Sequence, residues 1–252
     1  NEQLYTIPLN DAVNANDECP FCYIERNVEQ DLLDFVLGSG SSYMEADIRE
    51  MTDKAGFCRQ HFQKMFDYGN TLGNAWILKT HYKKVIGEMK KEFAGFKPAK
   101  TSIKDKLKKT PGSGNAIGMW VRKKEESCYI CRHFKDTYAR YMDTFFYLWE
   151  QDDEFRRKIK EGKGFCLHHF GDLCEAADGR LPNRDKEDFY SAMFPLMERN
   201  MERLSEDVSW MVEKFDYRNK DADWKNSKDA IQRGMQKLKG GYPADGPYKM
   251  SK

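Results

Sequence analysis

The chain carries the same four-ligand motif twice, and this duplication constrains its fold more than any other feature. Each copy is a Cys-x-x-Cys pair followed by a Gly-Phe-Cys-x-x-His-Phe segment: CPFC (19–22) with GFCRQHF (56–62), and CYIC (128–131) with GFCLHHF (164–170). Cys22 and Cys58 are separated by 35 residues in the first copy, Cys131 and Cys166 by 34 in the second, and the copies are offset by 109 and 108 residues. A spacing kept this closely predicts an internal repeat.

Each copy offers three thiolates and one imidazole, which is the ligand set of tetrahedral zinc or of an iron–sulfur cluster. Residues three positions apart lie on one face of a helix, so both members of each pair can reach one ion. The sequence therefore predicts two Cys3His metal centres. The first is expected from Cys19, Cys22, Cys58 and His61, and the second from Cys128, Cys131, Cys166 and His169.

This pairing keeps each centre within one repeat. A swapped arrangement, in which Cys19 and Cys22 share a metal with Cys166 and His169, is compatible with the same spacings. We expect the pairing within repeats, because closing a short stretch of chain costs less entropy than closing a long one.

Other histidines and the seventh cysteine do not fit the motif. His169 is preferred over its neighbour His168 because only Cys166 and His169 repeat the three-residue spacing of Cys58 and His61. Cys174 is expected to be a buried structural thiol. His81 and His133 are isolated and are read as ordinary side chains, so no catalytic residue is assigned.

Zinc is the default metal for a closed Cys3His set, and we expect two zinc ions. The alternative is two [4Fe–4S] clusters with one histidine ligand each, because the Cys-x-x-Cys pairs run directly into helices instead of a knuckle turn. We expect Gly56 and Gly164 to let the chain turn before the second pair of each centre. Aromatic walls are expected from Phe57, Phe62, Phe165 and Phe170.

Apolar residues recur every three or four positions, and alternation with a period of two is almost absent, so the sequence predicts an all-α fold. Two tandem pseudo-symmetric four-helix repeats are expected, each built around a Cys3His centre, with one further C-terminal helix. In the first repeat the helices are expected at about 19–37, 43–54, 58–69 and 72–93. In the second they are expected at about 120–149, 154–160, 166–177 and 184–215, with a break before Cys128 for which Ser127 could serve as N-cap.

The expected organisation has four parts. Residues 1–94 form the first metal-binding repeat, 95–118 a basic Gly/Pro linker, 119–215 the second repeat, and 216–252 a tail with one helix near 227–239. The lysines of the linker could alternatively contact nucleic acid, but no aromatic residues are interleaved with them.

Composition bounds the class of protein. The 252 residues are 40% hydrophobic and 33% charged, with 42 basic and 41 acidic side chains and a net charge of +1, so no global field attracts nucleic acid or an anionic membrane. No apolar run reaches the roughly 18 residues of a spanning helix, and the N-terminal residues do not read as a secretion signal. We expect a cytoplasmic protein, in which seven cysteines at ligand spacing favour metal over disulfides.

The repeated CPFC…GFCRQHF and CYIC…GFCLHHF segments, followed by Lys-Phe-Asp-Tyr-Arg-Asn at 214–219, resemble a bacterial family, common in Firmicutes, that is known as a domain of unknown function. The resemblance covers nearly the whole chain. It implies an intracellular, metal-binding helical protein, and it implies no reaction and no substrate.

Three functions follow from these observations. The first is a non-enzymatic, zinc-stabilised scaffold that binds a protein partner, because four protein ligands leave no open position for catalysis. The second is an electron-transfer or redox-sensing protein with two clusters. The third is an enzyme that uses acids such as Glu25, Glu45, Asp47 or Asp207, although no phosphate loop, nucleophile elbow or HExxH motif is present.

Overall fold

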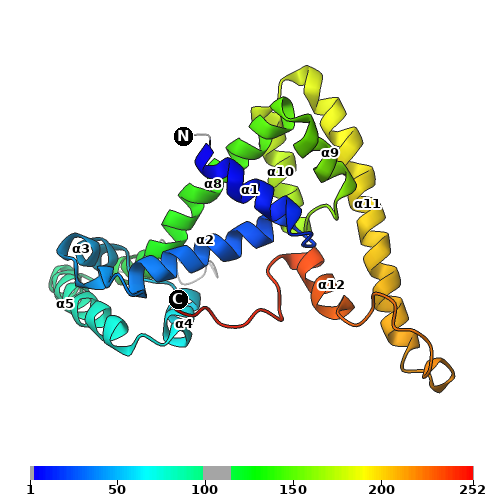
Figure 1. Cartoon of the computed structure of the whole chain (residues 1–252). Coiled ribbons are helices and arrows are strands. Elements are labelled where there is room, and N and C mark those ends of the chain that lie inside the picture. Colours follow the sequence, from blue (N-terminus) through cyan, green and yellow to red (C-terminus); the bar gives the residue numbers. More distant parts are fainter. Residues whose placement is uncertain (1–2, 99–114, 252) are drawn as a thin grey trace, which may run out of the picture. The chain divides into compact units, whose positions relative to one another are not determined.

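The computed structural model describes residues 3–98 and 115–251, which form eleven α-helices, two short 3-10 helices and no β-strand. The all-α prediction is confirmed for this part of the chain. The chain forms two compact units, each assembled from two separate stretches of sequence (Figure 1). Unit 1 comprises Asn1–Val28 and Asp136–Gly246, and unit 2 comprises Glu29–Lys135 and Pro247–Lys252.

Unit 1 is built around an aromatic core. Phe145 lies at its centre and contacts the rings of Phe21, Phe155 and Phe165, with centroid separations of 5.6 to 5.9 Å. All four rings are buried, and aromatic burial on this scale is a large hydrophobic contribution to folding. The unit contains α1 (Gln3–Asn14), the first part of α2 (Pro20–Leu37), the last part of α8 (Tyr129–Gln151), α9 (Asp153–Glu161), α10 (Leu167–Arg180), α11 (Asn183–Glu213), the 3-10 helix η2 (Tyr217–Asn219) and α12 (Ala230–Lys239).

Helix α12 lies along the C-terminal part of α11 (Figure 1) and is fixed by buried charges. The Lys237 ammonium group is 1% exposed and donates to the backbone oxygens of Glu18 and Lys163 at 2.5 and 2.6 Å. The Glu18 carboxylate also accepts from Arg203 and Arg233. Because an unpaired buried charge is costly, this network fixes α12 against the residues that precede Cys19.

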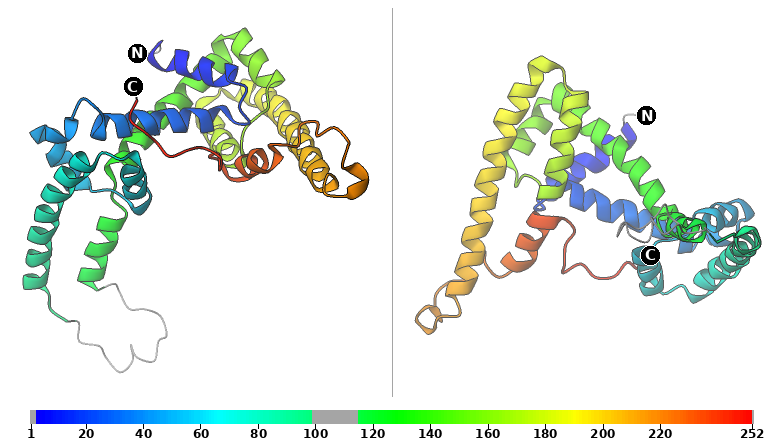
Figure 2. Two further views of the ribbon diagram at one scale, coloured as in Figure 1. Left: turned by 60° about the horizontal axis from the view of Figure 1, so that its bottom comes forward. Right: turned by 180° about the vertical axis from the view of Figure 1, so that it is seen from behind.

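Unit 2 packs around an aliphatic and aromatic core that includes Leu33, Val36, Leu37, Met65 and Ile77. Helix α7 runs beside α5 (Figure 2, left), and the ion pair between Lys124 and Glu88 joins them. The unit contains the rest of α2, the 3-10 helix η1 (Ser42–Met44), α3 (Ala46–Ala55), α4 (Arg59–Tyr68), α5 (Thr71–Gly95), α7 (Ala116–Glu125) and the first part of α8.

Most helix boundaries follow from local signals in the sequence. Asn70, Asn115 and Asp152 cap α5, α7 and α9, because each side chain accepts a hydrogen bond from a backbone N–H of the first turn. The break predicted within 120–149 is present between α7 and α8, although Cys128, and not Ser127, directly precedes α8. Helix α1 was not predicted, and its sequence contains Pro8.

The compact units do not coincide with two consecutive repeats. Each unit combines helices from both halves of the sequence, and α2 and α8 contribute residues to both units. Of the predicted linker, residues 99–114 lie outside the described residues. No helix among the described residues is long and apolar enough to cross a membrane.

Candidate metal centres

The eight predicted ligands come together in two groups of four, but the pairing within repeats is wrong. The first group consists of Cys19, Cys22, Cys166 and His169, and lies wholly in unit 1. The second consists of Cys58, His61, Cys128 and Cys131, and lies wholly in unit 2. Each centre therefore combines the Cys-x-x-Cys pair of one repeat with the Cys-x-x-His pair of the other, which is the swapped arrangement.

The rigidity of helix α2 explains this outcome. Its 18 residues span about 27 Å, and they lead the chain away from Cys22 before Cys58 is reached. Helix α3 has 10 residues, about 15 Å, and is too short by itself to bring the chain back over that distance. The pairing within repeats was predicted from the closure entropy of a flexible loop. That entropy does not describe a connection that is made largely of helices.

All four ligand pairs lie at helix starts. Cys58 and Cys166 are the N-cap residues of α4 and α10, while Cys19 and Cys128 directly precede α2 and α8. The second ligand of each pair then lies in the first turn. The backbone N–H groups of Cys131 and His169 each approach, at 3.4 Å, the sulfur that begins their pair. Unpaired N–H groups and the positive end of the helix dipole favour thiolate at these positions.

The first centre is closed to solvent. Cys19, Cys166 and His169 are fully buried, and Cys22 is 6% exposed. The Nδ1 atom of His169 lies 3.3, 3.6 and 3.2 Å from the sulfurs of Cys19, Cys22 and Cys166, and the sulfurs of Cys22 and Cys166 are 3.8 Å apart. A Cβ at Gly240, after α12, would meet these last two sulfurs at 3.8 and 3.6 Å, so the backbone there covers the site closely.

A carboxylate and two aromatic rings surround His169. Its Nε2 atom lies 3.1 Å from Glu25 Oε1, although the ring N–H does not point at that oxygen as in a hydrogen bond. The rings of Phe21 and Tyr138 lie with centroids 5.6 and 5.7 Å from the imidazole. Tyr138 in turn donates to Asp172. The imidazole is thus held with Nδ1 toward the sulfurs and Nε2 toward the carboxylate.

The second centre has the same ligand geometry with a more open surface. His61 Nδ1 lies 3.2, 3.3 and 3.3 Å from the sulfurs of Cys58, Cys128 and Cys131, and the sulfurs of Cys58 and Cys131 are 3.8 Å apart. His61 and Cys128 are buried, Cys58 is half-buried, and Cys131 is exposed.

Glu29 supports His61 through a hydrogen-bond network. His61 Nε2 lies 2.9 Å from Glu29 Oε1, and Lys64 donates to both oxygens of that carboxylate at 2.5 and 2.6 Å. The Tyr248 hydroxyl donates to Glu29 Oε2. A carboxylate on the outer ring nitrogen orients the imidazole and makes the inner nitrogen a stronger ligand.

These contacts shift the protonation of both histidines. Burial disfavours the imidazolium form of His61, but hydrogen bonds with Cys128 and Glu29 outweigh it and raise its pKa to about 10. Burial likewise opposes protonation of His169, while Cys166, Cys19 and Glu25 raise its pKa to about 12. A proton on Nδ1 therefore competes with a metal ion for each centre.

Charged partners also shift the acids at the second centre. Burial would raise the pKa of Glu29, but the hydrogen bonds from His61, Lys64 and Tyr248 lower it to about 2. Burial would likewise raise the pKa of Cys128, while the imidazolium of His61 and two backbone N–H groups lower it to about 6. Cys128 therefore becomes a thiolate, the form that binds metal, more readily than an ordinary cysteine does.

The glycines beside the ligands adopt the turn conformation that was predicted, whereas the phenylalanines differ from one another in burial. Gly56 and Gly164 have φ of 66° and 72°, a backbone conformation that favours glycine over other residues. Phe57 and Phe165 are buried, whereas Phe62 and Phe170 are only partly buried.

Of the residues set outside the motif, His168 has a side chain that is 61% exposed and 3.8 Å from Asp172. It is His169, and not His168, that lies with Cys19, Cys22 and Cys166. Cys174 belongs to neither centre, but it is half-buried and not buried as expected. His81 lies at hydrogen-bond distance from a backbone oxygen, and the ring of His133 is tilted against that of Tyr129 with the centroids 4.4 Å apart.

Sequence reasoning missed the two carboxylates that face the histidines. Glu25 was considered only as a possible catalytic acid, and Glu29 was not considered. Both lie on α2, four residues apart. The three-residue spacing from Cys22 to Glu25 was a usable signal for the first of them, whereas His61 and Glu29 meet only through tertiary structure.

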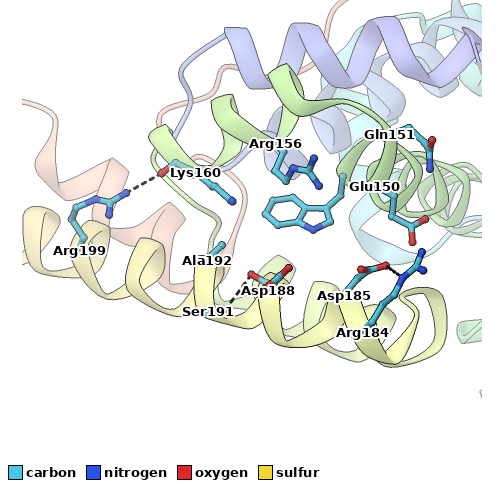
Figure 3. A pocket seen from close by; sticks show the side chains of 11 residues that line it. Glu150, Gln151, Arg156, Lys160, Arg184, Asp185, Asp188, Ser191, Ala192 and Arg199 are labelled. Carbon is cyan, nitrogen blue, oxygen red and sulfur yellow. Dashed lines mark hydrogen bonds and ion pairs between the residues drawn. The ribbon is translucent and has the colours of Figure 1, made fainter.

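Unit 1 also contains an open cavity of about 750 Å³ (Figure 3). It lies between α9 and α11, next to the end of α8. Basic and acidic side chains both line it, among them Arg156, Lys160, Arg184, Asp185 and Asp188. Arg184 pairs with Asp185 and Arg156 with Asp153, so part of this charge is already neutralised.

Comparison with known proteins places the chain in a family. The model of a family described as "Family of unknown function (DUF6062)" matches residues 1–245. No curated protein and no solved structure matches the chain. Because the family model spans nearly the whole chain, including all eight candidate ligands, the protein belongs to the DUF6062 family of unknown function.

Proposed function

We propose that this protein is a helical scaffold in which one structural zinc ion holds each compact unit together, and that it serves to bind a protein partner. The observation that carries the proposal is the spacing of the ligand atoms. Tetrahedral zinc with Zn–S bonds of about 2.3 Å places two thiolate sulfurs about 3.8 Å apart. The sulfur pairs Cys22–Cys166 and Cys58–Cys131 are both separated by 3.8 Å.

The same spacing argues against the alternative of two [4Fe–4S] clusters. Each ligand of such a cluster binds a different iron, so the ligand atoms must lie about 6 Å or more apart. Within each group, all four ligand atoms lie within 4.8 Å of one another. These distances suit one ion per centre.

A structural role is supported by the completeness of each ligand set. Three cysteines and one histidine fill a tetrahedral shell, whereas a catalytic zinc keeps one position for water or substrate. Each ion would also join two helix starts that are distant in sequence: α2 to α10 in unit 1, and α4 to α8 in unit 2. Metal binding would then contribute directly to the folding free energy of both units.

The partner-binding role is supported by the loop that follows α11. Phe215 and Tyr217 are 83% and 85% exposed, which is unusual for large aromatic side chains. Their loop is nevertheless ordered, because the buried Lys214 ammonium group donates to the backbone oxygens of Asn219, Lys220 and Ala222. Exposed aromatic residues on an ordered support are typical of protein-binding surfaces.

Elemental analysis of anaerobically purified protein tests the metal. The expected result is a colourless protein with two zinc ions per chain. A brown protein that contains iron and acid-labile sulfide would contradict the proposal and favour electron transfer. The partner-binding role is tested separately by photo-crosslinking from position 217 in cells, with position 147 as a control because Tyr147 is also exposed. Equal crosslinking from both positions would contradict it.

A further inference from the structure

The two centres share one ligand geometry but differ in exposure. In both, the Nδ1 atom of a buried histidine lies 3.2 to 3.6 Å from three sulfurs, and one pair of sulfurs from different helices is 3.8 Å apart. In the first centre those two sulfurs belong to the buried Cys22 and Cys166. In the second they belong to the half-buried Cys58 and the exposed Cys131.

Open cavities reach both of these more exposed sulfurs. A cavity of about 820 Å³ is lined by Cys128 and Cys131 together with Trp120, Arg132 and Lys135. A second cavity of about 760 Å³ is lined by Cys58. A small molecule dissolved in water can therefore approach Cys131 and Cys58 directly.

We propose that Cys131 is an oxidation site, and that a hydroperoxide converts Cys131 and Cys58 into a disulfide and releases the zinc ion of the second centre. The first centre keeps its zinc, because its sulfurs are covered. This inference rests on the proposed zinc occupancy, and it adds a chemical reactivity to a site that would otherwise be structural.

The chemistry balances in two steps. The Cys131 thiolate attacks one oxygen of the hydroperoxide; the S–O bond forms, the O–O bond breaks, and hydroxide or alkoxide leaves with the electron pair. The Cys58 thiolate then attacks the sulfenic sulfur; the S–S bond forms, the S–O bond breaks, and hydroxide leaves. The two thiolates lose two electrons in total, the hydroperoxide gains them, and water protonates the leaving groups.

The geometry of the second centre suits this reaction. The two sulfurs must close from 3.8 Å to about 2.0 Å, a movement within reach of side-chain rotation. After it, only Cys128 and His61 remain as ligands, and two ligands do not retain a zinc ion that four had bound. The disulfide still joins α4 to α8, so unit 2 keeps a covalent link at the place where the ion had joined these helices.

The test uses the full-length protein loaded with two zinc ions and titrated with hydrogen peroxide. Released zinc is followed with a chromogenic chelator, and disulfides are mapped by mass spectrometry after alkylation. We expect release of one of the two ions together with formation of a Cys58–Cys131 disulfide. After reduction of the disulfide and addition of zinc, the second centre should bind an ion again. Release of neither ion, release of both at one rate, or a Cys22–Cys166 disulfide would overturn the proposal.

Conservative ligand changes provide the matched pair. Cys131→His keeps a zinc ligand but removes the exposed sulfur, so its zinc should be retained in peroxide. Cys22→His makes the same change in the first centre and should leave peroxide-driven release from the second centre unaltered. If the second centre of Cys131→His does not bind zinc, the disulfides mapped in the peroxide-treated unaltered protein test the proposal instead. A purified protein without zinc would instead count against the proposed function, before any peroxide is added.

Discussion

His61 and Glu29 face each other at 2.9 Å, ring Nε2 to carboxylate Oε1, while Nδ1 of the same ring lies within 3.3 Å of three cysteine sulfurs. In the first centre His169 Nε2 likewise lies 3.1 Å from Glu25 Oε1, although the ring N–H is not aligned for a hydrogen bond. A carboxylate next to Nε2 orients an imidazole so that its Nδ1 atom faces the metal ion. The recurrence of this pair at both centres supports metal binding independently of the cysteines.

Glu29→Gln should weaken zinc binding at the second centre. The amide keeps the shape of the side chain but lacks the negative charge. In the unaltered protein Lys64 and Tyr248 donate hydrogen bonds to that charged carboxylate. Losses of about 10-fold to 100-fold are typical for such a change. Competition with a chromophoric chelator measures the effect, and Glu25→Gln is the matched change at the first centre. Equal affinities in Glu29→Gln and the unaltered protein would show that this carboxylate does not support the metal.

Double substitutions test the swapped pairing by counting ions. Cys22→Ser combined with Cys166→Ser alters one centre only, so one zinc ion per chain should remain. Cys22→Ser combined with Cys58→Ser alters both centres, so neither should bind tightly. Elemental analysis of the two purified proteins provides the counts. The opposite pattern, with one ion retained by the second combination, would restore the pairing within repeats.

The sequence identified the residues that come together in the two centres, but it did not show which pairs share a centre. Residue type and three-residue spacing identify Cys58 and His61 as a pair, because both features are local and belong to one helix start. The partner of that pair depends on the directions in which α2 and α3 lead the chain, and helix periodicity does not encode these directions. The same limit applies to Glu29, whose contact with His61 joins α2 to α4.

Helix α1 was missed because tertiary packing, and not its local sequence, stabilises it. Gln3–Asn14 forms α1 although Pro8 lies inside it. Leu9 and Ala12 of this helix are fully buried in unit 1, and tertiary burial can outweigh a poor intrinsic propensity. Helix α9 has a strongly amphipathic sequence, and its bounds were predicted to within one residue at each end.

Zinc affinity at the second centre should rise with pH. The pKa of His61 is about 10 in the folded protein, against about 6.5 for an ordinary histidine, so in a zinc-free preparation its proton stabilises the fold fully below about pH 6.5. That stabilisation is lost as the pH rises toward 10. Because zinc must displace this proton, binding near pH 7 should release one proton from His61 in addition to those from the thiols.

Calorimetry in two buffers of different ionisation enthalpy measures this proton release. The double variant Cys22→Ser with Cys166→Ser isolates the second centre for the measurement. Adding Glu29→Gln should reduce the proton release, since the carboxylate contributes to the raised pKa. An affinity that does not change between pH 6 and pH 9 would contradict the predicted competition.

Gly164→Ala should destabilise unit 1. Gly164 has φ of 72°, and a Cβ placed there would lie 3.1 Å from the sulfur of Met197. Both the backbone strain and the close contact oppose the substitution, and the strain alone costs on the order of 1 kcal/mol or more. Because Gly164 precedes Cys166 by two residues, zinc affinity at the first centre should fall as well. Denaturant unfolding and chelator competition measure the two effects.

Gly171→Ala is the matched control in the same region. Gly171 lies inside α10, and a Cβ there would meet nothing within 4 Å. Alanine is favoured over glycine within a helix by roughly 0.5 to 1 kcal/mol, so this variant should be slightly more stable than the unaltered protein. If both variants shift the unfolding midpoint in the same direction, the turn before Cys166 does not depend on the conformation that Gly164 adopts.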